Sequence, residues 1–211
     1  MGTRIAEPST GAQASGRISF EQFLVDYDGE HVEWVDGEVL PMSPVSNRHV
    51  RIHFFLLSLL GRYNEVHSAG EILFEPFCMK IGPDLPARSP DILFVANEHA
   101  DRVKKTHLEG PADLVVEIVS PDSRKRDRGE KYYEYEKGGV PEYWLIDPIR
   151  EAAEFYRLDV AGTYTAVPPD DTGYYHSAVL DGLRLQPAWL WQDPLPPVPS
   201  LLVDAGLSAW A

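Results

Sequence analysis

Apolar residues recur at helical spacing in two stretches near the N-terminus of the chain. Ser19 and Gln22 match a capping box, and the apolar residues after Ser19 predict a short helix ending near Tyr27. From His49 to about Val66, apolar residues cover most of a helical circumference, which predicts a helix buried on most sides. The main apolar stripe of this second helix consists of Val50, Phe54, Leu57, Leu60 and Tyr63, and it is widened by Ile52, Phe55, Leu56 and Leu59.

Short apolar runs bounded by Pro, Gly and Asp predict strands along the rest of the chain. Residues 31–40 read as a hairpin with Asp36-Gly37 as its two-residue turn. The polar stretch 123–137 is compatible with a helix, and Gly138-Gly139 ends it. This order favours an α/β (α+β) fold, a mixed central sheet flanked by helices, in which a crossover helix joins two parallel strands. The predicted strands are 72–81, 91–96, 113–120 and 142–147, followed by extra C-terminal strands at 153–158, 164–167 and 175–180.

The length of 211 residues indicates one domain with short extensions. Residues 1–17 are small and polar without periodicity, so we expect a tail. Residues 18–190 form the predicted domain. The Pro-rich residues 191–211 form a C-terminal extension that we expect to run extended over the surface.

Composition narrows the class of protein. The single cysteine, Cys78, excludes an internal disulfide framework and fits a cytoplasmic location. No apolar run is long enough to cross a bilayer, so no membrane partner is expected. The 19 basic and 33 acidic residues leave a net charge of −14, which predicts weak nonspecific binding to nucleic acid. Ten of the basic residues fall within 101–150, and the densest cluster, expected to meet any polyanion, is Arg124, Lys125, Arg126 and Arg128.

Two carboxylates interrupt predicted strands. Asp91 opens one strand, and Glu117 lies between Val115 and Val119 on the same face of another. A buried carboxylate is costly unless it is paired or binds a cation, and a divalent cation with oxygen ligands would also relieve the repulsion between two of them. The alternatives are a strand-start role for Asp91 and a buried ion pair for Glu117.

Four segments, in this order, resemble the Uma-type (Uma-two) restriction endonuclease family of the PD-(D/E)XK nuclease superfamily. They are Ser-Pro-Asp-Ile at 89–92, Asp-Leu-Val-Val-Glu-Ile-Val-Ser-Pro at 113–121, Asp-x-x-x-Lys-x-x-x-Tyr at 127–135 and Gly-Val-Pro-Glu-Tyr-Trp-Leu-Ile-Asp-Pro at 139–148. The resemblance extends over about residues 18–185. It implies a restriction-endonuclease-like fold and a divalent-metal site that hydrolyses phosphodiester bonds in nucleic acid, with DNA as the expected substrate.

The resemblance also implies roles for individual residues. Asp91 matches the motif aspartate and Glu117 the motif glutamate, and the backbone carbonyl of Ile118 would add a third ligand to Mg²⁺ or Mn²⁺. The parent motif has a lysine two residues after the glutamate, where this chain has Val119. Lys131 on the following helix matches the position from which this family supplies the lysine.

Further residues are candidates for the same site, each with an alternative. Glu33 would extend the metal site from the hairpin, or is an exposed edge-strand carboxylate. Lys131 shares a helix face with Tyr135 and Asp127, and its alternative role is an ion pair with Asp127. His49 is a candidate cleft residue, as is Tyr135, although core packing is the favoured role of His49. A metal shared by His49 and His53 is disfavoured, because no glutamate completes the zinc-protease pattern.

The predicted function is therefore a metal-dependent endonuclease. A homodimer would set two basic clusters side by side, although no residue of the sequence demonstrates one. Two alternatives stay open: a catalytically inert binding or regulatory domain, which the charge and Val119 favour, and a hydrolase of smaller phosphate esters.

Overall fold

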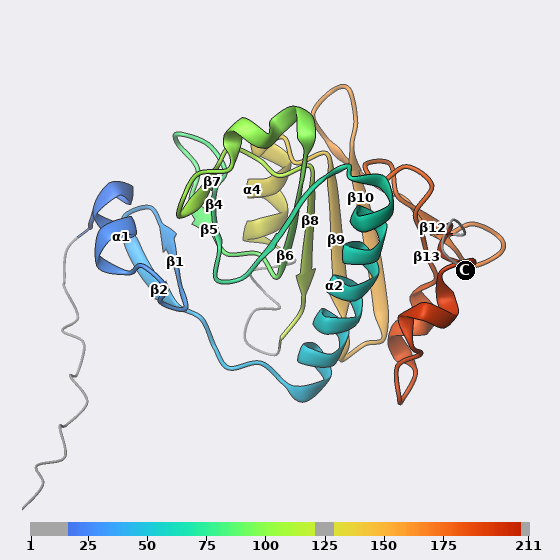
Figure 1. The fold of residues 1–211 in the computed structure, drawn as a ribbon. Coiled ribbons are helices and arrows are strands. Elements are labelled where there is room, and N and C mark those ends of the chain that lie inside the picture. Colours follow the sequence, from blue (N-terminus) through green and yellow to red (C-terminus); the bar gives the residue numbers. More distant parts are fainter. Residues whose placement is uncertain (1–16, 121–128, 208–211) are drawn as a thin grey trace, which may run out of the picture.

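A six-stranded mixed sheet forms the centre of the protein in a computed structural model that describes residues 17–120 and 129–207 (Figure 1). Within it, β8 and β9 are parallel and every other neighbouring pair is antiparallel. The strands stand in the order β11 (Tyr164–Ala166), β10 (Ala152–Leu158), β9 (Glu142–Asp147), β8 (Leu114–Ile118), β6 (Ile92–Ala96) and β3 (Gly70–Phe74).

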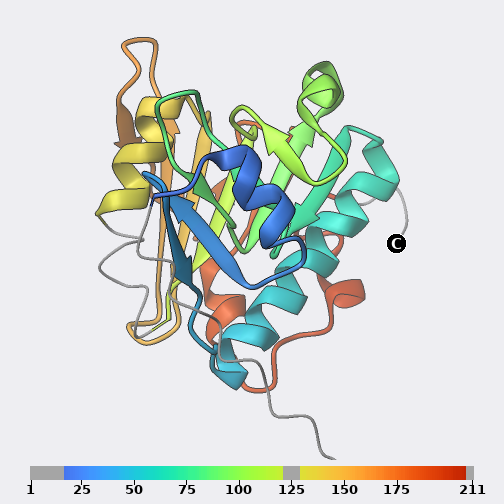
Figure 2. The same cartoon turned by 90° about the vertical axis from the view of Figure 1, so that its left-hand side faces the viewer.

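Two layers cover this sheet. Helix α2 (Asn47–His67) packs on one face, and α4 (Glu130–Gly138) packs on the other together with a second sheet (Figure 2). The second sheet has the order β2 (Glu38–Pro41), β1 (Val32–Val35), β5 (Ala87–Arg88), β4 (Cys78–Lys80) and β7 (His107–Glu109). The remaining elements are α1 (Phe20–Asp26), η1 (Asn97–Arg102), β12 (Tyr175–His176), β13 (Arg184–Leu185), η2 (Pro187–Trp191) and η3 (Val198–Leu201).

The predicted crossover is confirmed, because α4 lies between the parallel strands β8 and β9. Helix α4 ends at Gly139, whose φ of 81° is the left-handed conformation expected of a glycine C-cap. Strand β9 is fully buried, as expected for a central parallel strand. The mixed sheet flanked by helices is thus the predicted fold class.

The N-terminal predictions are also confirmed. The side chain of Ser19 accepts a hydrogen bond from the backbone N–H of Gln22 and caps α1. Asp36 and Gly37 connect β1 to β2 with φ of 49° and 88°, as the tightest hairpin turns require. This hairpin carries Glu33 into the interior of the protein.

The predicted stripe of α2 is only partly correct. Val50 and Phe54 are exposed, and the buried face is made by Ile52, Phe55, Leu56, Leu59, Leu60 and Tyr63. A helix that is apolar almost all round has two competing stripes, and periodicity alone does not decide which one meets the sheet.

The single strand predicted at 72–81 is wrong. The chain leaves β3 at Phe74, turns through Glu75 and Pro76, and enters β4 at Cys78 in the other sheet. Proline interrupts the ladder of a strand because it has no N–H to donate, which explains the break. The turn places Glu75 at the start of β6, where its backbone N–H donates a hydrogen bond to the carbonyl of Asp91.

The C-terminal extension was expected to run over the surface, but part of it is buried. Leu201 in η3, and Leu202, Ala205 and Leu207 after it, lie in the same core as α2. In the described part of the chain, none of the helices combines the length and apolarity that a bilayer span requires. Residues 1–16 of the predicted tail and the basic cluster at 124–128 lie outside the described residues.

Candidate functional site

A small polar pocket lies where β1, β6, β8, α2 and α4 converge. It has about 30 Å³ of room, which suits one or two ions or solvent molecules rather than an organic ligand. Its lining residues are Glu33, Met42, Ser43, Val45, His49, Glu75, Asp91, Glu117, Ile118, Ser120 and Lys131.

Asp91 is fixed at the start of β6 by three contacts. Its Oδ2 accepts a 2.5 Å hydrogen bond from the backbone N–H of Ile118, and its Oδ1 lies 3.0 Å from Nε2 of His49. The ring of His53, one helical turn further along α2, contacts the backbone carbonyl of Asp91 at 2.9 Å. The pairing of Ile92 with Val116 brings the adjacent residue, Asp91, next to Glu117 on β8.

Glu117 is approached from α4. The ammonium of Lys131 lies 2.9 Å from Glu117 Oε1, and the hydroxyl of Tyr135 donates a 2.6 Å hydrogen bond to the same oxygen. Val119, at the position of the motif lysine, is buried among apolar side chains. The ammonium near Glu117 is therefore that of Lys131 on α4, the helix from which the sequence predicts it.

Glu33 is buried at the other side of Lys131. Its Oε1 lies 3.2 Å from the Lys131 ammonium, and its Oε2 accepts a 3.0 Å hydrogen bond from Arg88. Burial opposes ionisation of Glu33, but Lys131 and Arg88 outweigh it and hold its pKa below the usual range. The alternative of an exposed edge-strand carboxylate is wrong, because β1 lies inside its sheet and Glu33 is 2% exposed.

Arg88 was not identified from the sequence. It is fully buried and is held by two hydrogen bonds of 2.7 Å to the carboxylate of Glu134, in addition to its bond with Glu33. The only sequence signal is its place two residues before Pro90 in the segment that leads to Asp91. Its guanidinium ties β1 and β5 to α4, which aligns Glu33 and Lys131.

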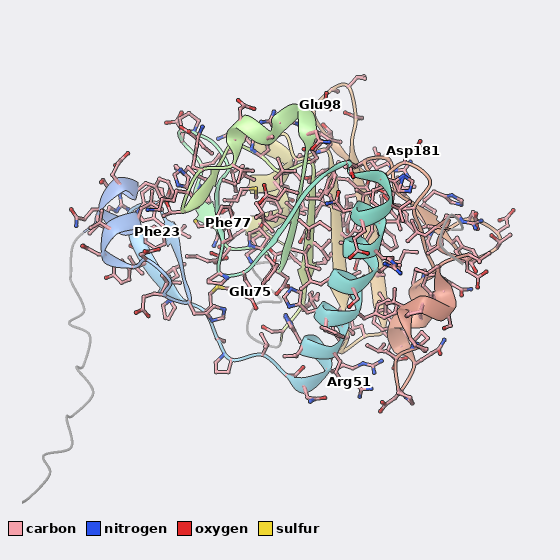
Figure 3. The ribbon with its side chains drawn as sticks, in the orientation of Figure 1. Phe23, Arg51, Glu75, Phe77, Glu98 and Asp181 are labelled. Carbon is pink, nitrogen blue, oxygen red and sulfur yellow. The ribbon has the colours of Figure 1, made fainter. Side chains whose placement is uncertain are left out.

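Glu75 was also missed, because it fell inside a predicted strand. Figure 3 shows it on the loop that follows β3, to the left of the lower part of the central strands. Within the described residues, the one group of three or more potential metal ligands whose atoms all lie within 4.8 Å of one another is His49, Glu75 and Asp91. Glu75 is in turn contacted by the ring of His31 at 3.1 Å.

Among the described residues, the pocket lining holds more negative than positive groups. The carboxylates of Glu33, Glu75, Asp91 and Glu117 line it together with the ammonium of Lys131, and Arg88 contacts Glu33. Such a set is costly in a low-dielectric interior unless a cation joins it, and carboxylate oxygens are the ligands that Mg²⁺, Ca²⁺ and Mn²⁺ prefer. The donor set therefore fits a divalent metal ion.

The structure brings most of the predicted site residues together. Glu33, His49, Asp91, Glu117, Ile118 and Lys131 line the pocket, and Tyr135 contacts Glu117 from behind. Arg124, Lys125, Arg126 and Arg128 lie outside the described residues, and their role in nucleic-acid binding stays a prediction.

Comparison with known proteins identifies the family of this chain and a solved structure of the same fold. Residues 19–188 match the model of the Uma2 family, described as "putative restriction endonuclease", and the chain belongs to this family. Among solved structures it is similar to a "putative nuclease" belonging to DUF820 from Anabaena variabilis ATCC 29413, with a TM-score of 0.67 and 19% sequence identity. The similarity covers 82% of this chain and 97% of the other, and it establishes the shared fold. A search of curated proteins found no match.

Proposed function

We propose that this chain is a divalent-metal-dependent endonuclease that hydrolyses phosphodiester bonds in DNA. The observation that carries the proposal is the meeting of Asp91, Glu117 and Lys131 in one pocket, on a chain that belongs to a family with a nuclease description. In this proposal Asp91, Glu117 and the carbonyl of Ile118 hold Mg²⁺ or Mn²⁺. The bound cation would supply Lewis-acid stabilisation of the negative charge that develops on the scissile phosphate.

The chain's own residues would do the rest. Lys131, close to Glu117, orients the attacking water and stabilises charge on the phosphate in the transition state. Tyr135 fixes the rotamer of Glu117, and Arg88 fixes Glu33 on the opposite side of Lys131. Since the pocket has room for little more than an ion and solvent, the phosphate would meet these groups at the pocket mouth.

A cleavage assay tests this function directly. Supercoiled plasmid and linear single-stranded DNA are incubated with the chain in Mg²⁺, in Mn²⁺ and in EDTA, and the products are separated on gels. We expect nicked or linear products only with metal, and loss of cleavage in Asp91→Asn, Glu117→Gln and Lys131→Met. Lys137→Met, an exposed lysine in the last turn of the same helix, is the matched control.

A catalytically inert binding domain is the second candidate. Two observations favour it: the −14 net charge, and Val119 at the place of the motif lysine. The same assay separates the two functions, because an inert domain would bind the DNA and leave it intact under every metal condition. A hydrolase of smaller phosphate esters would leave the DNA intact as well but release p-nitrophenol from a p-nitrophenyl phosphate ester.

A further inference from the structure

The carboxylate of Asp91 has two oxygens with different surroundings. Oδ2 is held by the backbone N–H of Ile118, on the β8 side. Oδ1 lies instead against α2, 3.0 Å from Nε2 of His49. The carboxylate of Glu75 completes a group of three ligand atoms on this second side. Glu117 is not a member of the group.

From this arrangement we infer a second cation-binding position formed by His49, Glu75 and Asp91, selective for Mn²⁺ over Mg²⁺. It shares Asp91 with the position proposed for Asp91 and Glu117, and in this respect it rests on the proposed function. Nothing in the spacing of His49, Glu75 and Asp91 along the sequence points to this set.

The geometry suits a metal of this size. With metal–ligand bonds of about 2.1 Å, neighbouring octahedral ligands lie about 3.0 Å apart and opposite ones about 4.2 Å apart. The His49–Asp91 separation of 3.0 Å matches the first value, and the limit of 4.8 Å on the whole group requires only a small closure. The pocket's room of about 30 Å³ accommodates the ion.

Two of the three ligand residues, Glu75 and Asp91, are also contacted by histidines outside the group. The ring of His31 contacts Glu75 Oε2 at 3.1 Å, and the ring of His53 contacts the backbone carbonyl of Asp91 at 2.9 Å. Partners of this kind orient metal ligands and strengthen binding. His49 itself is buried in the first turn of α2, where Ser46 caps the helix through the backbone N–H of His49.

The imidazole nitrogen of His49 determines which metal ion this position prefers. Mg²⁺ takes oxygen ligands almost without exception in proteins, whereas imidazole is a common ligand of first-row transition metals. A position made of one imidazole and two carboxylates therefore favours Mn²⁺ over Mg²⁺. The Asp91–Glu117 position, built from oxygens alone, has no such preference.

Isothermal titration calorimetry with MnCl₂ and MgCl₂ on the metal-free full chain tests the inference without reference to activity. We expect His49→Gln and Glu75→Gln to weaken one of two Mn²⁺ binding steps at least about tenfold, because loss of a ligand should cost no less than loss of an outer partner. His49→Gln puts an amide oxygen near the place of Nε2, so the ratio of Mn²⁺ affinity to Mg²⁺ affinity at this position should also fall. Glu117→Gln should leave this step in place.

The controls are His67→Gln at the far end of α2 and Glu71→Gln on the exposed side of β3, which should bind Mn²⁺ as the wild type does. Mn²⁺ binding by both His49→Gln and Glu75→Gln equal to that of the wild type would overturn the second position, even if DNA cleavage is intact. Loss of the step in these variants, in a chain that cuts no DNA, would keep the second position and reject the proposed function. A wild type without Mn²⁺ binding would reject both.

Discussion

The hydroxyl of Tyr135 donates a 2.6 Å hydrogen bond to Oε1 of Glu117, and both side chains are buried. Burial and the neighbouring charge of Glu117 raise the pKa of Tyr135 well above its usual range. The hydroxyl therefore keeps its proton across the working pH range and remains a donor. Because Tyr135 stands on α4, one turn after Lys131, the helix fixes both groups that contact this oxygen of Glu117.

Tyr135→Phe removes this bond and little volume. A hydrogen bond to a charged group contributes about 1.5–3 kcal/mol, so the free energy of unfolding should fall by about that amount. Tyr164→Phe is the matched control, since its hydroxyl donates to the neutral carbonyl of Val140 and should contribute about 0.5–1.5 kcal/mol. Urea unfolding followed by circular dichroism measures both. An equal or smaller loss in Tyr135→Phe would mean that Glu117 is uncharged in the folded protein.

Lys131→Met tests how much the ammonium between Glu33 and Glu117 contributes to the free energy of unfolding. It leaves Glu33 and Glu117 buried without the ammonium that contacts both, and breaking a buried ion pair costs about 3–5 kcal/mol. The double variant Glu33→Gln/Lys131→Met should recover part of this stability, because Glu33, which would keep only Arg88 as a partner, no longer carries a buried charge. If Lys131 acts on the water or the phosphate, cleavage should stay absent in the double variant. Recovered cleavage would show that Lys131 only maintains the fold.

Much of this fold follows from local rules that can be applied to the sequence. The cap at Ser19 and the turn at Asp36-Gly37 each depend on one or two residues whose preferred geometry is strong. Strands β6, β8 and β9 are mostly apolar runs of strand length, as buried strands are. Asp91 and Glu117 stand out because they are charged within or beside these runs.

Glu75 and Arg88 could not be found in this way, because their roles depend on contacts across long sequence separations. Glu75 lies inside an apolar run that predicts one strand, whereas in the structure a turn at Pro76 ends β3 and leaves Glu75 beside the pocket. Arg88 bonds Glu33 and Glu134 across separations of 55 and 46 residues, and no local pattern encodes such a pairing. The face of α2 that meets the sheet was ambiguous for a similar reason, since only the partner surface selects between two apolar stripes.

The lowered pKa of Glu33 predicts that the free energy of unfolding falls at acid pH. Its folded-state pKa lies below the value of 4.5 expected when it is unfolded, so its charged form stabilises the folded protein. That contribution is fully present above the unfolded pKa and is lost as the pH falls through the folded pKa. Between pH 6 and pH 3, the free energy of unfolding should therefore decline more steeply in the wild type than in Glu33→Gln. Parallel curves in urea titrations over this range would show that Lys131 and Arg88 do not stabilise the ionised carboxylate.

The last prediction concerns how a chain of net charge −14 binds a polyanion. Four carboxylates at the pocket repel a phosphate at long range, and a cation bound there would offset this only locally. The basic cluster follows directly after β8, the strand that carries Glu117, so it is the part of the sequence best placed to compensate. Each phosphate neutralised on duplex DNA contributes about 0.9 to the slope of log affinity against log salt, so three or four contacts predict a slope of roughly −3.

Replacing Arg124, Lys125 and Arg126 together with Ala should weaken DNA binding and flatten this slope by up to about 2.7, because up to three such contacts are lost. Mn²⁺ affinity measured by calorimetry should not change, since none of the three is a metal ligand in either proposed position. The control is Lys104→Ala/Lys105→Ala, two exposed lysines remote in sequence from the cluster, which should leave the slope nearly unchanged. Fluorescence anisotropy across a salt series gives the slopes. If the triple variant binds DNA with the wild-type slope, the cluster does not contact phosphate, and a substrate without a polyanionic backbone becomes the better explanation of the pocket.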